Sequence, residues 1–308
     1  MFGNRSVDFH GNVYSMGGGN INSNTAFGIG SLTANNTGVG ISAYGTNTLN
    51  KITNGANIVG IGTNTFMNYT GVSTNTVGIG PLVAENITTA TLNTSVFVGS
   101  SVAQNVTGLL SGVTAIGNAS LRNALTALRT VAIGSSTAQS AGSFTDSVFI
   151  GHVAGQAIVA TVANIVAIGS GALSATNTAS DIVAIGYQAL RNNTNGTQNT
   201  AIGYQASLAN TTGGGNVVLG YQNLLQNTIG SNNTGIGTQA LRGITNGSNN
   251  TALGYFAARS QNTSNVTAVG SSALTVNQTN GNTAVGFSAS SSNTTGSNVT
   301  TLGFRAGE

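Results

Sequence analysis

Hydrophobic and polar residues follow one short pattern along nearly the whole chain, and it stands in full as Asn-Thr-Ala-Ile-Gly-Tyr-Gln-Ala over residues 199–206. Each copy centres on a glycine preceded by a branched or aromatic apolar residue, here termed the anchor glycine, from which positions are numbered. The sequence places these glycines at Gly28, Gly40, Gly62, Gly80, Gly99, Gly117, Gly134, Gly151, Gly169, Gly186, Gly203, Gly220, Gly237, Gly254, Gly270, Gly286 and Gly303. Their mean spacing is about 17 residues. A fixed period of this length predicts a solenoid.

The apolar residue directly before each anchor glycine predicts a strand. Several coils also have valine at position −3, and apolar residues two apart are typical of a strand with one face inward. We therefore expect the −1 column to be buried. The predicted core residues are Ile133, Ile168, Ile185, Ile202 and Ile236, with the glycines Gly134, Gly186, Gly203 and Gly237. Leucines at +4, such as Leu173, Leu190 and Leu241, predict a second inward column.

Glycine also predicts the corners of each coil. The anchor glycine suits a corner because it reaches backbone conformations closed to other residues. A second corner is predicted at four Asn-Gly pairs, which favour turns with positive φ at both residues. These pairs are Asn54-Gly55, Asn195-Gly196, Asn246-Gly247 and Asn280-Gly281. The long gap from Gly40 to Gly62 predicts a protruding loop from Tyr44 to Asn57.

These patterns predict an all-β protein, a parallel β-roll or β-solenoid of coils of about 17 residues. The repeat domain is expected over residues 24–308, with residues 1–23 as an N-terminal cap or attachment segment. Strands stacked about 4.8 Å apart would give a rod about 80 Å long. Such a thin coil buries little area alone, so we expect a closed homo-oligomer.

Composition narrows the class of protein. Only 4% of residues are charged and the net charge is +3, but 39% are hydrophobic, which argues against disorder. The few basic residues do not cluster, so nucleic-acid binding is not expected. The first 20 residues lack an apolar core, which predicts no signal peptide. The uncharged stretch from Val153 to Leu173 contains the anchor glycine Gly169 and Asn164 at the repeat register, so we expect coils there rather than membrane insertion.

No catalytic set emerges from the sequence. The five acidic residues are scattered, which argues against a pair of catalytic carboxylates, and the two histidines stand apart, which argues against a metal cluster. These residues are Asp8, Glu85, Asp146, Asp181, Glu308, His10 and His152. There is no cysteine. We therefore expect neither an enzyme nor a protein with a metal or cofactor.

Asparagine and threonine form regular columns before the glycine. Asparagine at −4 predicts a hydrogen-bonded amide ladder that satisfies turn backbone; the residues are Asn24, Asn36, Asn199, Asn216, Asn233, Asn250 and Asn282. The threonine that follows also raises an ice-binding array as an alternative. Since that rank is interrupted between Thr37 and Thr200, ice binding is the weaker hypothesis.

Two further columns are candidates for ligand binding. An aromatic column at +1 is followed by glutamine at +2, and it predicts either stacking between coils or a stripe that binds carbohydrate. Arginine recurs at +5 and predicts either a solvated edge or a contact with an anionic glycan or phosphate. The candidate residues are Tyr187, Tyr204, Tyr221, Tyr255, Gln188, Gln205, Arg191, Arg242 and Arg259.

The repeats resemble those of known fibrous proteins. Thr130-Val131-Ala132-Ile133-Gly134 and Asp181 to Gly186 resemble the head repeats of trimeric autotransporter adhesins of the YadA type. Asn199 to Ala206 is similar to repeats of bacteriophage tail fibres and giant-virus surface proteins. The resemblance implies a left-handed parallel β-roll assembled as an elongated homotrimer. Because adhesin repeats are shorter and the chain shows no heptad stalk or membrane-barrel anchor, it favours a viral fibre.

The sequence therefore predicts a structural or adhesive fibre protein on a virion or cell surface, outside the cell, that displays repeated polar loops for host attachment. Its expected partners are further copies of itself, as a homotrimer with end-to-end stacking, and surface glycans or a host receptor. A self-assembling extracellular filament and a bacterial adhesin head stay open as alternatives.

Overall fold

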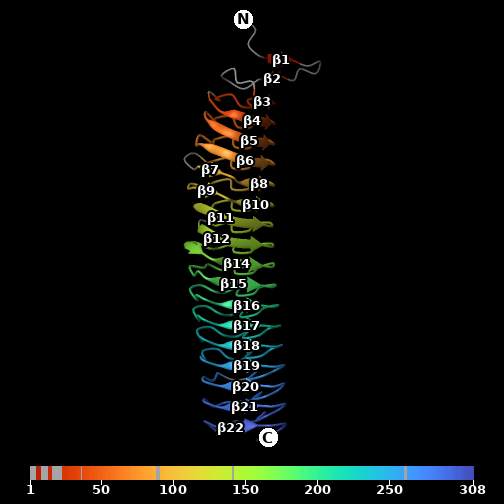
Figure 1. Cartoon of the computed structure of the whole chain (residues 1–308), viewed down its shortest axis with the longest axis vertical. Helices are drawn as coiled ribbons and strands as arrows, with labels where there is room; N and C mark the ends of the chain where they lie inside the picture. Colours follow the sequence, from red (N-terminus) through yellow and green to blue (C-terminus); the bar gives the residue numbers. More distant parts are fainter. Residues whose placement is uncertain are drawn as a thin grey trace. The chain divides into compact units, whose positions relative to one another are not determined.

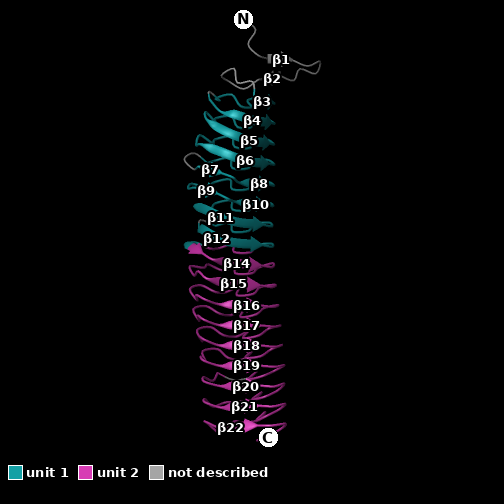
Figure 2. Cartoon of the chain, viewed as in Figure 1, with its two compact units in different colours: residues 1–153, 159–161 teal, residues 154–158, 162–308 magenta. Residues whose placement is uncertain are grey.

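A computed structural model describes residues 5–7, 13–15, 23–35, 37–87, 91–140, 142–259 and 262–308. They form short strands joined by turns, and they contain no helix. The chain divides into two compact units, residues 1–153 with 159–161 and residues 154–158 with 162–308 (Figure 2). Each unit is a parallel β-solenoid with coils of about 17 residues, as the sequence predicts.

The first unit begins with antiparallel pairing and continues as parallel coils (Figure 1). Strand β2 pairs antiparallel with both β1 and β3, and from β3 onward each strand pairs in parallel with the next coil. The strands are β1 (Arg5–Val7), β2 (Val13–Ser15), β3 (Thr25–Phe27), β4 (Val39–Tyr44), β5 (Gly55–Ile61), β6 (Ser73–Ile79), β7 (Leu92–Asn93), β8 (Val96–Val98), β9 (Leu110–Ser111), β10 (Thr114–Ile116), β11 (Thr126–Ile133) and β12 (Ser143–Ile150).

From β14 onward the second unit repeats one short strand per coil (Figure 1). Successive strands from β14 to β22 are parallel and pair equivalent positions, such as Ile185 with Ile202 and Ile202 with Leu219. The strands are β13 (Thr161–Ala163, with Thr161 in the first unit), β14 (Ile165–Ile168), β15 (Ile182–Ile185), β16 (Thr200–Ile202), β17 (Val217–Leu219), β18 (Thr234–Ile236), β19 (Thr251–Leu253), β20 (Thr267–Val269), β21 (Thr283–Val285) and β22 (Thr300–Leu302). Identical columns therefore run from coil to coil.

The second coil has its anchor at Gly45, not at Gly40. Gly45 has φ 130° and donates its N–H to Phe27, as Gly62 does to Tyr44, whereas Gly40 lies inside β4 with φ 66°. The gaps from Gly28 to Gly62 are then 17 and 17 residues. The predicted protruding loop from Tyr44 to Asn57 is wrong, because Tyr44 ends β4 and Asn57 lies within β5.

The anchor glycines form a corner that no other residue fits, which confirms their predicted role. With Gly45 in place of Gly40, the φ angles of the anchor glycines lie between 125° and 140°. A Cβ atom on Gly134 would lie 2.5 Å from the carbonyl oxygen of Gly151 in the next coil. Glycine at this corner thus satisfies both a positive φ and a close backbone approach, except at Gly303 of the last coil, where only the positive φ applies.

The Asn-Gly pairs do not form the predicted turns. Gly55, Gly196 and Gly247 have no positive φ, and neither do the asparagines before them. These glycines allow close stacking instead: a Cβ on Gly247 would clash with the Thr263 carbonyl of the next coil. Gly281 does have φ 74°, but it occupies position −5 of its coil. Positive φ recurs at −5, +2 and +4, as at Gln198, Gln205 and Ser207 of one coil.

The −1 column faces outward, so the predicted burial is wrong. Ile236 is 40% exposed, while Ile133, Ile168, Ile185 and Ile202 are only half-buried. The inward residue is the small one at −2, such as Ala184 or Ala201, which is fully buried. The coil is too thin for a large side chain on both inner walls. The +4 leucines Leu173, Leu190 and Leu241 are buried, as predicted, and leave room only for a small residue opposite.

The sizes of the −2 and +4 side chains are complementary. A Cβ on Gly78 at −2 would clash with the ring of Phe66, the +4 residue of the preceding coil. Where −2 is large, as at Phe97 or Phe149, the preceding +4 residue is Ala84 or Ala138. Every one of these side chains is fully buried. The combined volume of the −2 side chain and the +4 side chain before it thus stays nearly constant, as close packing of the core requires.

Buried asparagines line the second unit, which confirms the predicted amide ladder. Asn199 Nδ2 donates to the Gly213 carbonyl at 2.8 Å, and Asn199 Oδ1 accepts the Asn216 N–H at 2.9 Å. The same contacts recur from Asn216 to Asn233. The ladder satisfies backbone carbonyl groups at −7 and N–H groups at −4 that would otherwise be buried without partners. Predicted Asn36 lies outside the described residues.

Candidate functional site

The aromatic column at +1 is a stack of rings in the second unit. Tyr187 and Tyr204 have centroids 5.2 Å apart with planes 18° apart, and Tyr204 and Tyr221 repeat this at 5.2 Å and 11°. Each ring is a little under half exposed. The faces of Tyr204 are covered by its neighbours, so only ring edges and hydroxyls reach solvent. A sugar ring therefore has no free face on which to stack at Tyr204.

The glutamines at +2 form a matching amide ladder. Gln205 Nε2 donates to Gln188 Oε1 at 3.0 Å, and Gln222 and Gln239 continue the series at 3.0 and 3.2 Å. The series ends where Phe256 replaces glutamine, and the Gln239 Oε1 atom is buried without a donor. Tyr187, Tyr204, Gln188 and Gln205 therefore form one surface built on adjacent coils.

Tyr255 stands apart from that surface. Its ring stacks on Phe256 of the same coil, with centroids 3.8 Å apart, because Thr238 interrupts the aromatic column on the preceding coil. The guanidinium of Arg259 lies 4.2 Å from the centroid of the Phe256 ring. Tyr255 thus belongs with an arginine cluster rather than with the tyrosine stack.

The arginines at +5 have different surroundings. Arg122 donates from Nε to Gln104 at 3.0 Å, and Gln104 donates to Glu85 at 2.7 Å, so a carboxylate lies at the end of that series. Arg242 and Arg259 occupy adjacent coils: the Gly243 N–H donates to the Arg259 carbonyl at 2.7 Å. Arg191 lies three coils before Arg242 at the same position. Only Arg242 and Arg259 are brought together.

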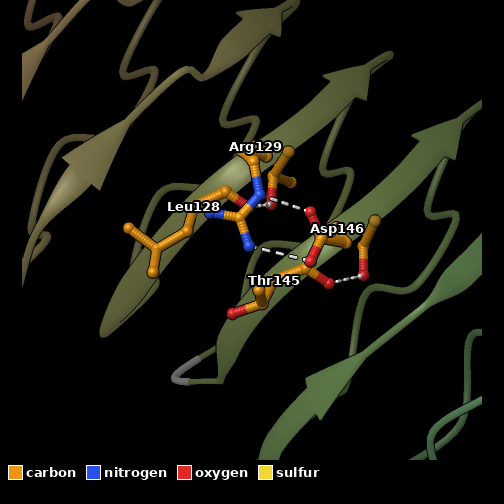
Figure 3. A network of polar contacts seen from close by, with 6 residues as sticks. Leu128, Arg129, Thr145 and Asp146 are labelled. Atoms are coloured by element: carbon orange, nitrogen blue, oxygen red, sulfur yellow. Dashed lines mark hydrogen bonds and ion pairs between the residues drawn. The ribbon is translucent and has the colours of Figure 1, made fainter.

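One surface ion pair escaped the sequence reasoning. Arg129 on β11 contacts Asp146 on β12 through Nε–Oδ1 at 2.5 Å and Nη2–Oδ2 at 2.8 Å (Figure 3). The two occupy position −5 of adjacent coils, which is the signal that could have found them. The hydrogen bond that Arg129 donates lowers the pKa of Asp146. The same hydrogen bond, together with the negative charge of Asp146, raises the pKa of Arg129. Because both side chains are exposed, the pair is solvated and of small effect on stability.

The outward strand face is the largest feature that sequence reasoning missed. Positions −3 and −1 contain only aliphatic, aromatic, threonine or serine residues from β3 to β22. In the first unit Ile61 and Ile79 are 40% and 38% exposed, and in the second unit Leu219 and Leu253 are 47% and 46% exposed. Each unit thus carries an apolar stripe along its parallel strands.

The threonines of this face are continuous in the second unit. Position −3 is threonine in five successive coils, paired in parallel register, and all five lie outside the core. They are Thr234, Thr251, Thr267, Thr283 and Thr300. The interruption of the threonine rank in the sequence, between Thr37 and Thr200, lies before this run.

The described residues contain no group of three or more histidine, cysteine, aspartate or glutamate side chains that could hold a metal ion. Asp8 and His10 lie outside those residues. Within the same ranges no helix is long and apolar enough to cross a membrane, and the apolar stretch from Val153 to Leu173 includes β13 and β14.

Comparison of the chain with models of protein families, with curated proteins and with solved structures gives no match.

Proposed function

We propose that this chain is a structural fibre protein of a virion or cell surface, a left-handed solenoid that assembles as a homotrimer through its outward strand faces. The observation that carries the proposal is the apolar stripe at −3 and −1. Parallel sheets are normally covered on both faces, and here the core covers only one. The second face needs a partner.

A further copy of the same chain is the partner that fits best. Side chains along the stripe recur at the spacing of parallel strands, about 4.8 Å, and only a surface with that period matches it over many coils. The stripe has no charged residue at −3 or −1, so two like faces do not repel each other. A closed symmetric assembly buries every copy of the face. The resemblance to adhesin heads and tail fibres favours three copies and a left-handed coil.

The role in attachment follows from the resemblance. Trimeric fibres of this kind present repeated polar loops to host surfaces, and here the polar positions lie away from the stripe, as with Asn232 and Asn249 at −5. An anionic or glycan receptor is the expected partner outside the assembly.

Sedimentation equilibrium tests the assembly. The full chain should give three times its mass of 30.5 kDa. Replacing Ile236 and Leu253 with aspartate should abolish the trimer, since buried unpaired charges are costly. Asn232→Asp with Asn249→Asp adds the same charge to the same two coils away from the stripe and should leave the trimer intact. A folded monomer for the unmodified chain would refute the proposal.

A second candidate function uses the same face. The run of five in-register threonines favours ordered-water or ice binding by the second unit. Burial in a trimer and contact with ice are mutually exclusive for this surface. Thermal hysteresis of the purified chain, lost in Thr251→Leu with Thr267→Leu, would support ice binding. Freezing without hysteresis would remove this candidate.

A further inference from the structure

Arg242 and Arg259 are two positive charges on adjacent coils with no acidic partner in their unit. Of the acidic residues, that unit contains only Asp181 and Glu308. Asp181 accepts a hydrogen bond from Asn164 at 2.8 Å, and Glu308 forms an ion pair with Arg305 at 2.9 Å. Like charges on neighbouring strands repel each other unless a counter-charge is shared.

The guanidinium group of Arg259 is held in place before any ligand binds, and the coil of Arg242 is joined to that of Arg259. Arg259 lies 4.2 Å from the centroid of the Phe256 ring, which is itself stacked on Tyr255. A cation over an aromatic face is attracted by the ring quadrupole. The backbones of the two coils are joined by the bond from Gly243 N–H to the Arg259 carbonyl. Little ordering remains to oppose binding.

An unsatisfied charged donor lies in the coil of Arg242. Arg242 Nε is buried and has no hydrogen-bond partner, although it is a charged donor. A buried charged donor without an acceptor is costly, and an oxyanion would supply the acceptor.

We propose that Arg242 and Arg259 bind a tetrahedral oxyanion, a sulfate or phosphate group, between adjacent coils of the second unit. Guanidinium groups suit this ligand because their planar donors contact two oxygens at once. The faces of the Phe256 ring are occupied by Arg259 and Tyr255, so the site recognises the anionic group and not a sugar ring.

Nε–H spectra of ¹⁵N-arginine-labelled full-length chain test this directly, because the chain has only seven arginines. Inorganic sulfate, added at constant ionic strength in exchange for chloride, should shift the Arg242 and Arg259 signals with saturation. Arg191, at the same position without an arginine on either neighbouring coil, should not shift. Arg242→Gln and Arg259→Gln should each lower the association constant for sulfate about tenfold or more. Arg191→Gln should leave it unchanged.

Phe256→Leu provides an independent test, since it removes the ring but no charge. It should weaken sulfate binding several-fold, with circular dichroism showing a folded chain. Equal, non-saturating shifts of the Nε–H signals of all the arginines would show only general screening of charge by the salt. That result would overturn the proposed site. Acetate binding as tightly as sulfate would overturn the assignment to a tetrahedral anion.

Discussion

The anchor glycine is constrained at the residue scale by two separate causes. Its φ angle lies in the region that side chains disfavour, and the next anchor glycine carbonyl occupies the place of its Cβ. Sequence alone indicated the glycine but not the second cause, which requires the stacking of coils. The error at Gly40 has the same origin: Val39-Gly40 matches the local pattern, and only pairing across coils distinguishes it from Tyr44-Gly45.

Replacement of Gly203 by alanine tests both constraints. A φ of 137° lies outside the left-handed helical region and costs a residue with a Cβ about 1–3 kcal/mol, and forced overpacking adds about 1–3 kcal/mol. We expect Gly203→Ala to lower the free energy of unfolding by about 3 kcal/mol. Gly112→Ala is the control, because its φ is 65° but the nearest atom to a Cβ is 3.7 Å away. Equal urea midpoints for the two variants would contradict the stacking account.

Tyr69 gives a prediction about alkaline pH. Its side chain is fully buried, and the hydroxyl approaches the Ser73 side chain and the backbone N–H of Leu92 without a well-formed hydrogen bond. Burial raises the pKa of Tyr69 above its usual value of about 10. Stability is therefore complete below pH ~10 and is lost as pH rises toward the folded-state pKa.

Tyr69→Phe removes that titration. The variant should differ from the parent by less than about 1 kcal/mol at pH ~7, and it should be the more stable of the two at pH ~11. Urea midpoints at both pH values measure this, with Tyr221→Phe in the exposed stack as the control. Identical losses in parent and Tyr69→Phe between the two pH values would show that Tyr69 does not contribute.

At the scale of the element, the sequence predicts the period of the coils. It does not predict which face of each strand is buried. Alternation along a strand fixes two sets of side chains without saying which set points inward, and a shift of one residue exchanges them. The larger residues at −1 looked like core. The +4 leucines, correctly predicted as inward, and Phe66 already fill the coil, so only alanine or glycine fits opposite them.

The same limit applies to the candidate site. The tyrosine and glutamine columns and the adjacency of Arg242 and Arg259 follow from the period alone. The displacement of Arg259 onto Phe256 does not, because it depends on one aromatic residue replacing glutamine at +2. The Arg129–Asp146 pair required recognition of the −5 column, whose common feature is a positive φ rather than a residue type.

Exchange of Phe66 and Gly78 tests the complementarity within the coil. Phe66→Ala should cost about 3–5 kcal/mol through its cavity, and Gly78→Phe alone should destabilise by overpacking. The double variant places a large residue at −2 against alanine at +4, as Phe97 and Ala84 are placed. It should be at least 2 kcal/mol more stable than the sum of the single changes, on the order of the coupling between contacting residues. Additive effects would contradict direct contact.

At the scale of the whole molecule, the two units differ in what fills the corner opposite the strand. After Asn35 in the first coil, residues at +7 of the first unit are apolar or aromatic, as at Ile52 and Ile87, whereas asparagine occupies +7 in much of the second unit, as at Asn210 and Asn227. The outward stripe is the feature common to both. The proposed function thus depends on what covers that stripe, and we propose that further copies of the chain cover it.

Cysteine cross-linking of the cysteine-free chain tests the central claim most directly. Ile202→Cys, on the outward face, and Asn192→Cys, exposed on another side of the preceding coil, are each treated with a short bismaleimide. The account predicts covalently joined chains for Ile202→Cys at low protein concentration and single chains for Asn192→Cys. Single chains for Ile202→Cys, or equal cross-linking at both positions, would contradict it.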